Sequence, residues 1–247
     1  MNSFFANGVG NESPEEVFFV SRLLDLEQTE HRGLFEQCKY PWEVLSKIGP
    51  YLRETVMREM KNVFVGEAYI GKDVYIGEGS VVEDGAMILG PAYIGRNVVI
   101  RHGAYIRENV IVGDECVVGN STELKNCILF NGVQVPHFNY VGDSILGYRV
   151  HLGAGVIISN LRSIQGNVKV KFGAIEIDTG LRKFGAVVGD KAEIGCNAVL
   201  NPGSIIGRGS VVYPCVSWRG YLPPYKIAKN RASVEIVDID RKNDCKE

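Results

Sequence analysis

Apolar residues recur at every sixth position along the middle of this chain. Between Ile70 and Leu124 an isoleucine, valine or leucine stands at each of these positions, and a glycine follows several of them. Small or branched residues, such as Val74, Ser80 and Ala86, recur four places after the aliphatic ones. A period of six matches neither the helical period of about 3.6 residues nor the period of about two of an ordinary strand. It predicts an all-β protein, a parallel β-helix, in which each coil has three short flat faces and the aliphatic residue points inward.

The β-helix is expected to occupy residues 63–216, and its repeat is disturbed at two places. The step from Val141 to Leu146 is five residues instead of six. Before Val188 the repeat is lost altogether, and alternating apolar and polar residues there predict a β-hairpin inserted at about 161–187. Because loops that leave a repeat scaffold often carry binding functions, both places are candidates for a site.

The two ends of the chain do not keep the repeat. Residues 1–62 carry helix-start signals at Ser13-Pro14 and at Pro41, followed by apolar residues at helical spacing. This segment is predicted to be a small N-terminal helical cap that covers the open first coil. Residues 217–247 are expected to form a C-terminal cap or tail, with a strand-like stretch at 234–239.

Composition narrows the class of protein. A formal net charge of -2 argues against nucleic-acid binding, which needs a basic surface. The N-terminus does not resemble a signal peptide, and no apolar run approaches the roughly 18 residues of a membrane span, so we expect no membrane association and a cytoplasmic location. The six cysteines include no CxxC pair, which predicts reduced thiols without a zinc site or a disulfide framework.

One histidine stands where the repeat is disturbed. His137 follows Pro136, and Glu123 lies fourteen positions before it. Since ideal coils of about eighteen residues place neighbouring coils side by side, a glutamate and a histidine at this separation can meet. A carboxylate that holds one imidazole nitrogen raises the basicity of the other, and such a pair suits a general base. Spacing alone leaves a purely structural role for His137 open.

The chain from Tyr105 to Asn160 resembles a family of hexapeptide-repeat acyltransferases. It is similar to the C-terminal acetyltransferase domain of bifunctional glucosamine-1-phosphate N-acetyltransferase/N-acetylglucosamine-1-phosphate uridylyltransferase, and to archaeal sugar-1-phosphate counterparts. The matching strings are VGNSTELK at 118–125, HFNYVGDSILG at 137–147 and LGAG at 152–155. The resemblance implies a left-handed β-helix, acetyl-CoA as acyl donor, a homotrimer, and a hexosamine 1-phosphate acceptor, with glucosamine 1-phosphate as the first guess.

The resemblance also implies roles for individual residues. His137 matches the base that takes a proton from the sugar amine, and Glu123 matches the residue that orients this base. A backbone position at Ala154 matches the acetyl-CoA site, where a glycine on each side permits close approach. The remaining matches are contacts to the phosphate and the sugar: Arg107, Lys125, Tyr140 and Asn160.

Two positions depart from the family pattern. His151 replaces a sugar-contacting asparagine, which leaves the identity of the acceptor open. The family has a Lys-Phe pair shortly after the matching asparagine. Alignment backward from Val188 places this pair at Lys183, whereas counting forward from Asn160 gives Gly166, and we prefer Lys183. The inserted hairpin, with Lys169, Lys171 and Arg182, is a candidate lid over an anionic ligand.

Alternatives remain at this point. One alternative is an O-acyltransferase of the same fold that acts on a different acceptor. Another is a non-catalytic scaffold or regulatory subunit of a separate nucleotidyltransferase. A zinc carbonic anhydrase of this fold needs three histidine ligands, but His102, His137 and His151 lack a closely spaced pair. Residues 1–62 hold no glycine-rich nucleotide loop, so nucleotidyl transfer is not expected. Tyrosines on the flat faces, Tyr75, Tyr93 and Tyr105, are candidates for the trimer interface.

Overall fold

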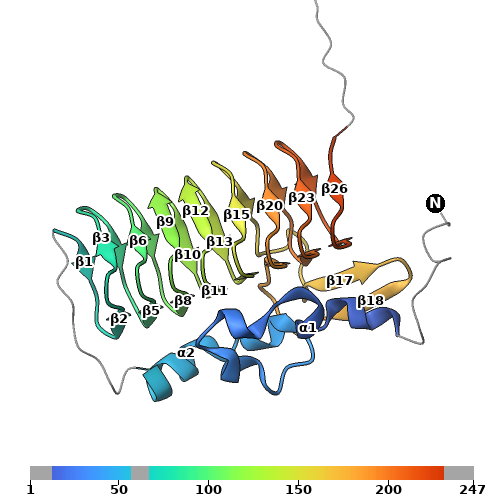
Figure 1. Cartoon of the computed structure of the whole chain (residues 1–247). Coiled ribbons are helices and arrows are strands. Elements are labelled where there is room, and N and C mark those ends of the chain that lie inside the picture. Colours follow the sequence, from blue (N-terminus) through green and yellow to red (C-terminus); the bar gives the residue numbers. More distant parts are fainter. Residues whose placement is uncertain (1–12, 57–66, 231–247) are drawn as a thin grey trace, which may run out of the picture.

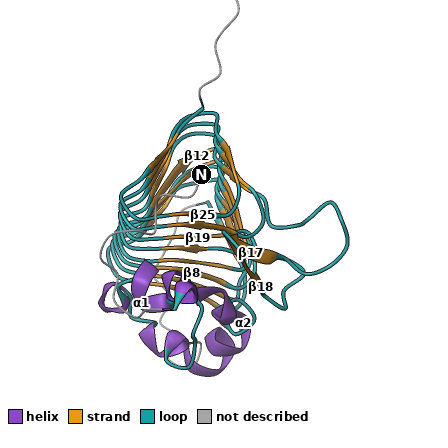
Figure 2. Ribbon diagram, turned by 90° about the vertical axis from the view of Figure 1, so that its right-hand side faces the viewer, coloured by secondary structure: helices purple, strands orange, loops and turns teal. Residues whose placement is uncertain are grey.

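The computed structural model describes residues 13–56 and 67–230. These residues build three parallel sheets of eight strands each, which form the walls of a triangular prism, and a separate two-stranded hairpin (Figures 1 and 2). Each full turn of the chain adds one strand to every wall. The predicted fold class, a parallel β-helix with a small N-terminal helical segment, is confirmed.

The strands are short and lie in register along each wall. Sheet A contains β1 (Tyr69–Ile70), β4 (Met87–Ile88), β7 (Tyr105–Ile106), β10 (Glu123–Lys125), β13 (Tyr140–Gly142), β16 (Ile157–Ile158), β21 (Val199–Leu200) and β24 (Ser217–Trp218). Sheet B contains β2 (Val74–Ile76), β5 (Ala92–Ile94), β8 (Val110–Val112), β11 (Cys127–Leu129), β14 (Ile145–Leu146), β19 (Ala186–Val188), β22 (Ser204–Ile206) and β25 (Tyr221–Leu222). Sheet C contains β3 (Val81–Val82), β6 (Val99–Ile100), β9 (Val117–Asn120), β12 (Gln134–His137), β15 (His151–Leu152), β20 (Glu193–Ile194), β23 (Val211–Val212) and β26 (Ile227–Ala228).

The six-residue repeat fills the interior of the prism. Ile88, Ile94 and Ile100 come from three successive walls, and all three are fully buried in one core cluster. Burial of each such side chain stabilises the fold by roughly 1.5–3 kcal/mol. Cys116 and Cys127 belong to the same core, where they serve as small apolar residues.

The corner between sheets A and B is tight in the middle of the prism. Three residues there have left-handed backbone conformations: Asn109 (φ 62°), Asn126 (φ 45°) and Asp143 (φ 47°). Asparagine and aspartate tolerate this region better than other residues with a side chain. Glu123 pairs with Tyr140 in the next coil, so the coil here is seventeen residues long instead of eighteen. The short step at this corner brings polar side chains of successive coils together.

The N-terminal segment consists of short helical turns. They are the 3₁₀ turns Pro14–Phe18, Leu26–Gln28, Arg32–Phe35 and Pro41–Val44, the helices α1 (Val20–Leu23) and α2 (Ile48–Tyr51), and a π-helical turn at Leu52–Val56. Figure 2 shows these turns against the outer side of one wall, that of β8, β19 and β25. Our prediction that the segment covers the open first coil is therefore wrong for its described residues.

The reason lies in the sequence of sheet B. Its strands are apolar on both faces, and the outward side chains of Ile111, Ile128 and Ile145 pack with Trp42 and Phe18 of the N-terminal segment in a second core cluster. Strands that are buried on both faces are expected to be continuously apolar. The segment thus supplies the second layer that sheet B needs.

Cover by this segment also corrects the predicted interface tyrosines. Tyr93 is buried, its hydroxyl donates a 2.7 Å hydrogen bond to Glu30, and Tyr75 stacks on its ring. Both belong to sheet B, so the chain itself occupies the face that Tyr75 and Tyr93 were expected to offer. Tyr105 lies on sheet A, outside the covered wall.

The prism continues past its predicted end at residue 216. Strands β24, β25 and β26 add one more strand to each wall, and Leu222 and Ala228 occupy the interior. Residues 217–228 are therefore part of the β-helix and not a separate cap. The predicted start at residue 63 and the strand-like stretch at 234–239 lie outside the described residues.

The inserted hairpin forms where it was predicted, with β17 (Lys169–Phe172) antiparallel to β18 (Ile175–Asp178). Its Phe172 packs edge-on against Tyr221. The two lysines on β17 both pair with Glu176, and these bonds hold the pKa of that carboxyl well below its usual value. One carboxylate balances only one of the two positive charges of Lys169 and Lys171, so the interpretation of the hairpin as an anion-binding lid stays a prediction.

Candidate active site

The predicted base and the predicted acyl-donor position share one corner of the prism. His137 ends β12 at the turn from sheet C to sheet A, and Ala154 occupies the same turn one coil later. The backbone N–H of Gly155 donates a 3.0 Å hydrogen bond to the carbonyl of His137. The imidazole is exposed, and its neighbour Phe138 has a left-handed backbone conformation, with φ of 52°. A side chain on an exposed corner directly above a glycine-rich turn is well placed to meet a ligand that lies along the corner.

A buried asparagine fixes this corner from inside. The side-chain oxygen of Asn139 accepts a 3.1 Å hydrogen bond from the His137 N–H, and its amide donates to the carbonyl of Gly153 at 2.8 Å. Asn139 is only 2% exposed, so its own side-chain amide would otherwise be buried without a partner. Asn139 thereby joins the His137 turn to the turn that contains Ala154.

Glu123 lies on sheet A, beside Tyr140 in the next coil. Its carboxylate accepts a 3.0 Å hydrogen bond from Arg107, which follows β7. Among the described residues no hydrogen bond joins Glu123 to His137. The structure thus brings Glu123 and Arg107 together on sheet A, and it leaves His137 without a carboxylate partner in the described part of the chain.

A chain of hydrogen bonds runs from Tyr140 of sheet A to the corner between sheets A and B. The amide of Asn160 donates to the Tyr140 hydroxyl at 3.2 Å and to one carboxylate oxygen of Asp143 at 2.5 Å. The other carboxylate oxygen of Asp143 accepts from the amide of Asn126 at 2.8 Å. Burial, with a smaller effect of the Glu123 carboxylate, raises the pKa of Tyr140 above its usual value, so its hydroxyl stays protonated and can donate to a ligand.

Gly142 makes this arrangement possible. A Cβ at this position would lie 2.5 Å from the Tyr140 hydroxyl and 2.7 Å from the Asn160 amide nitrogen. Both distances are shorter than any ordinary contact of a carbon atom. The glycine therefore leaves the space in which Tyr140 and Asn160 meet.

The other predicted residues are spread over sheets A and C, the two walls that the N-terminal segment does not cover. Lys125 ends β10 at the corner between sheets A and B, and His151 is exposed on β15 of sheet C. Lys183 pairs with Leu161 in an isolated antiparallel bridge, and the N–H of Phe184 donates to the carbonyl of Asn160. The chain thus returns from the insertion beside the point where it left, which places Lys183, not Gly166, next to Asn160.

Sequence reasoning missed Asn139 and Asp143, although both lie in a string that it quoted. Asn139 follows Val133 by six residues and so occupies an inward position that holds small or apolar residues in other coils. A polar residue at an inward position indicates internal hydrogen bonds, and this signal was present for Asn139. No comparable signal marked Asp143, whose partners come from the coils on both sides.

A buried histidine, His31, lies away from this corner. His31 stacks edge-on against Tyr93 at 4.4 Å between ring centroids, and its Nδ1 lies 3.0 Å from the Tyr51 hydroxyl. Burial lowers the pKa of His31 to about 4, against a smaller opposing effect of Glu30 and Asp114. It therefore serves as a neutral packing residue between the N-terminal segment and sheet B.

Two structural features are absent from the described residues. Residues 13–56 and 67–230 contain no group of three or more histidine, cysteine, aspartate or glutamate side chains arranged to hold a metal ion. None of the helices in these ranges has the length and the hydropathy to cross a bilayer.

Fold and repeat together define a hexapeptide-repeat β-helix protein. Residues 88–176 match the family described as the GMPPB C-terminal domain. The chain is 33% identical over 185 residues to a bifunctional sugar-1-phosphate nucleotidylyltransferase/acetyltransferase of Sulfurisphaera tokodaii, which covers 75% of this chain and 46% of that protein. It is 36% identical over 187 residues to the bifunctional protein GlmU of Methanococcus maripaludis, with 76% of this chain and 45% of that protein covered.

The chain is therefore related, over three quarters of its length, to the bifunctional nucleotidylyltransferase/acetyltransferases, and the predicted resemblance is confirmed. It spans less than half the length of these two relatives. Among solved structures, an Arabidopsis UDP-N-acetylglucosamine acyltransferase is 15% identical, with a TM-score of 0.39 over 67% of this chain and 69% of that chain.

Proposed function

We propose that the protein transfers an acetyl group from acetyl-CoA to the amine of a hexosamine 1-phosphate, with glucosamine 1-phosphate as the first candidate. The observation that carries the proposal is the shared corner, where the exposed His137 imidazole stands directly beside the glycine-rich turn of Ala154. The similarity to the sugar-1-phosphate nucleotidylyltransferase/acetyltransferase of Sulfurisphaera tokodaii supports the same chemistry.

In the proposed reaction His137 acts as general base. Its free imidazole nitrogen takes a proton from the amine as the amine nitrogen bonds to the acetyl carbon. The bond from that carbon to sulfur then breaks, and the proton can return to the departing coenzyme A thiolate. None of the backbone hydrogen bonds of the described residues uses the Ala154 N–H, so this group is available to stabilise the oxyanion of the tetrahedral intermediate.

The residues on sheet A would hold the acceptor. Arg107 and Lys125 carry the positive charge that a phosphate requires, with Lys183 as a further candidate, while Tyr140, Asn160 and His151 would contact the sugar. Glu123 is held by Arg107 in the single chain. We propose that a phosphate on Arg107 competes with this ion pair and leaves Glu123 available to orient the His137 imidazole.

We further propose a homotrimer that acts in the cytoplasm, with the acyl donor bound between neighbouring prisms. The N-terminal segment covers sheet B, but the outer faces of sheets A and C carry apolar columns without a cover in the described chain. On sheet C the column is Val81, Val99 and Val117, and on sheet A it begins with Tyr69, Met87 and Tyr105. Such faces favour closed symmetric association. We also propose a separate nucleotidyltransferase as a functional partner.

The test is an acceptor panel. Purified protein would be incubated with acetyl-CoA and either glucosamine 1-phosphate, glucosamine, or sugars that offer only hydroxyl groups, and release of the coenzyme A thiol would be followed. The proposal predicts turnover with glucosamine 1-phosphate above all others. Turnover with the hydroxyl acceptors alone would replace it by an O-acyltransferase, and absence of coenzyme A binding by calorimetry would favour a non-catalytic scaffold.

A further inference from the structure

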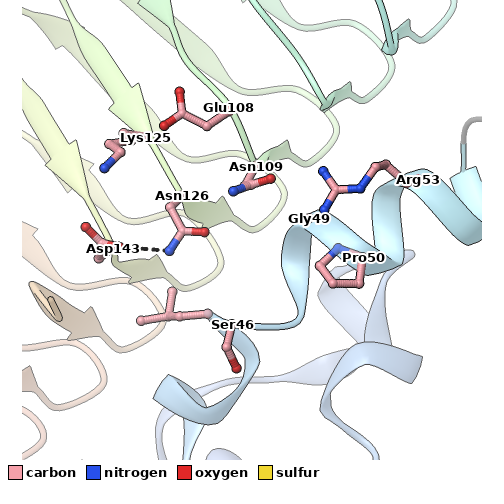
Figure 3. A pocket seen from close by; sticks show the side chains of 10 residues that line it. Ser46, Gly49, Pro50, Arg53, Glu108, Asn109, Lys125, Asn126 and Asp143 are labelled. Atoms are coloured by element: carbon pink, nitrogen blue, oxygen red, sulfur yellow. Dashed lines mark hydrogen bonds between the residues drawn. The ribbon is translucent and has the colours of Figure 1, made fainter. Parts of the chain in front are cut away.

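A cleft lies between the N-terminal segment and the corner that joins sheets A and B. It has a volume of about 490 Å³, within the range of small-molecule sites. One wall comes from α2 and the turn after it, including Gly49 and Arg53, and the other comes from the prism, including Lys125 and Asp143 (Figure 3). No ligand contact was predicted for the N-terminal segment.

The two walls of the cleft are in close contact at its end. A Cβ on Gly49 would lie 2.4 Å from the side-chain oxygen of Asn109 and 3.2 Å from a terminal nitrogen of Arg53. Only a glycine permits this approach of α2 to the left-handed corner residue Asn109. The position of Arg53 at the cleft thus follows from the way α2 is seated on the prism.

The acidic side chains that line the cleft have partners, whereas two of its basic side chains have none among the described residues. Asp143 already accepts hydrogen bonds from two asparagine amides, and Glu108 lies 3.6 Å from the Arg107 guanidinium. Neither the Lys125 ammonium nor the Arg53 guanidinium has an ion-pair or hydrogen-bond partner within residues 13–56 and 67–230. Figure 3 shows Lys125 on the prism wall and Arg53 on the helix wall. Two cationic side chains without a partner in the described part of the chain, beside two acids that have partners, favour an anionic ligand.

We propose that this cleft binds the phosphate on the anomeric carbon of the acceptor, and that Arg53 of the N-terminal segment is a specificity-determining contact to it together with Lys125. The inference rests on the proposed function, because Lys125 extends from the same sheet that carries Tyr140 and Glu123. Arginine presents a planar set of donors that matches phosphate oxygens, whereas lysine supplies a point charge. The N-terminal segment therefore contributes to recognition of the acceptor phosphate, in addition to covering sheet B.

The cleft proposal makes the preference for a phosphorylated acceptor depend on Arg53. The experiment compares the wild type with Arg53→Gln, Arg53→Lys and Lys125→Gln, and uses Arg219→Gln as the matched control, since Arg219 is exposed on the prism away from the cleft. KM would be measured for glucosamine 1-phosphate, for UDP-glucosamine and for glucosamine. The first two carry a phosphate on the anomeric carbon, and glucosamine does not. Arg53→Gln should raise KM for the phosphorylated acceptors about tenfold or more and leave KM for glucosamine unchanged, with partial rescue by Arg53→Lys.

A direct binding measurement separates this inference from the proposed function. Calorimetry with inorganic pyrophosphate as the probe should show binding to the wild type and to Arg219→Gln, and at least about tenfold weaker binding to Arg53→Gln. If the pyrophosphate result holds but no acceptor is acetylated, the proposed reaction is contradicted while phosphate binding in the cleft is supported. Equal pyrophosphate affinity of the wild type and Arg53→Gln, or no binding to the wild type, would overturn the inference.

Discussion

The N–H of Gly155 donates a 3.0 Å hydrogen bond to the carbonyl of His137. The same pattern continues one coil further, where the N–H of Asn197 donates to the carbonyl of Ala154 at 2.8 Å. Backbone hydrogen bonds therefore join successive coils along the corner between sheets C and A, and His137 takes part in them. A general base on a rigid element keeps its position relative to the acyl donor, which is the condition for efficient proton transfer.

The first prediction concerns Asn139, which ties this corner together from inside. Asn139→Ala should lower the free energy of unfolding by roughly 1–3 kcal/mol, because buried partners on both turns lose their hydrogen bonds. Urea denaturation measures this loss. Asn230→Ala removes one exposed hydrogen bond to Cys215 and serves as the control, with little expected change. An equal, small effect of both substitutions would show that Asn139 does not hold the corner.

The second prediction concerns Gly142, where added volume should affect catalysis more than folding. Gly142→Ala places a methyl group where Tyr140 and Asn160 now meet. We expect kcat/KM for glucosamine 1-phosphate to fall by roughly tenfold to a hundredfold, since displaced contacts misplace the acceptor. Unchanged kinetics in a folded Gly142→Ala variant would remove Tyr140 and Asn160 from the acceptor site.

Much of the fold could be predicted from the period alone, because an inward aliphatic residue at every sixth position has one simple structural solution. The position of the N-terminal segment could not be predicted in this way, although a signal was present. Val110–Val112 and Ala186–Val188 are apolar at every position, whereas Tyr105–Ile106 and Glu123–Lys125 present polar or amphipathic side chains outward. Continuous apolar strands on one wall indicate a second layer over that wall.

The site was predicted less completely than the fold. His137 and Ala154 are neighbours because seventeen residues separate them, which is one coil in this part of the prism. The residues around the cleft come from distant parts of the sequence, and the close approach of Gly49 to Asn109 has no local signal. Contacts between a repeat and a segment outside it depend on packing, which periodicity does not encode.

The third prediction concerns pH. His31 is neutral when buried, with a pKa of about 4, but in the unfolded chain its pKa returns to about 6.5. As the pH falls from 6.5 towards 4, the unfolded state therefore binds a proton that the folded state does not, and stability decreases. Between pH 7.5 and 4.5 this effect should cost about 2–3 kcal/mol.

Urea denaturation at both pH values tests this effect. His31→Gln should lose that part of the pH dependence, and His102→Gln, which changes an exposed histidine, should retain it. If His31→Gln and the wild type lose equal stability on acidification, His31 is not the group that titrates.

The fourth prediction concerns assembly through the open walls. Val99→Glu places a charge in the middle of the apolar column on sheet C, so it should convert a trimer into monomers. Native mass spectrometry or light scattering measures the mass. Gln37→Glu adds the same charge on the N-terminal segment, over sheet B, and should leave the trimer intact. A wild-type protein of monomer mass at micromolar concentration would contradict the proposed assembly.

The most direct test of the central claim is the turnover of His137→Ala with acetyl-CoA and glucosamine 1-phosphate, beside His102→Ala as an exposed histidine outside the site. The account predicts that kcat falls by roughly 10²–10⁴ in His137→Ala, while binding of coenzyme A and the activity of His102→Ala remain at wild-type values. Full activity of His137→Ala would contradict the account, because the shared corner of His137 and Ala154 would then not be where the reaction takes place.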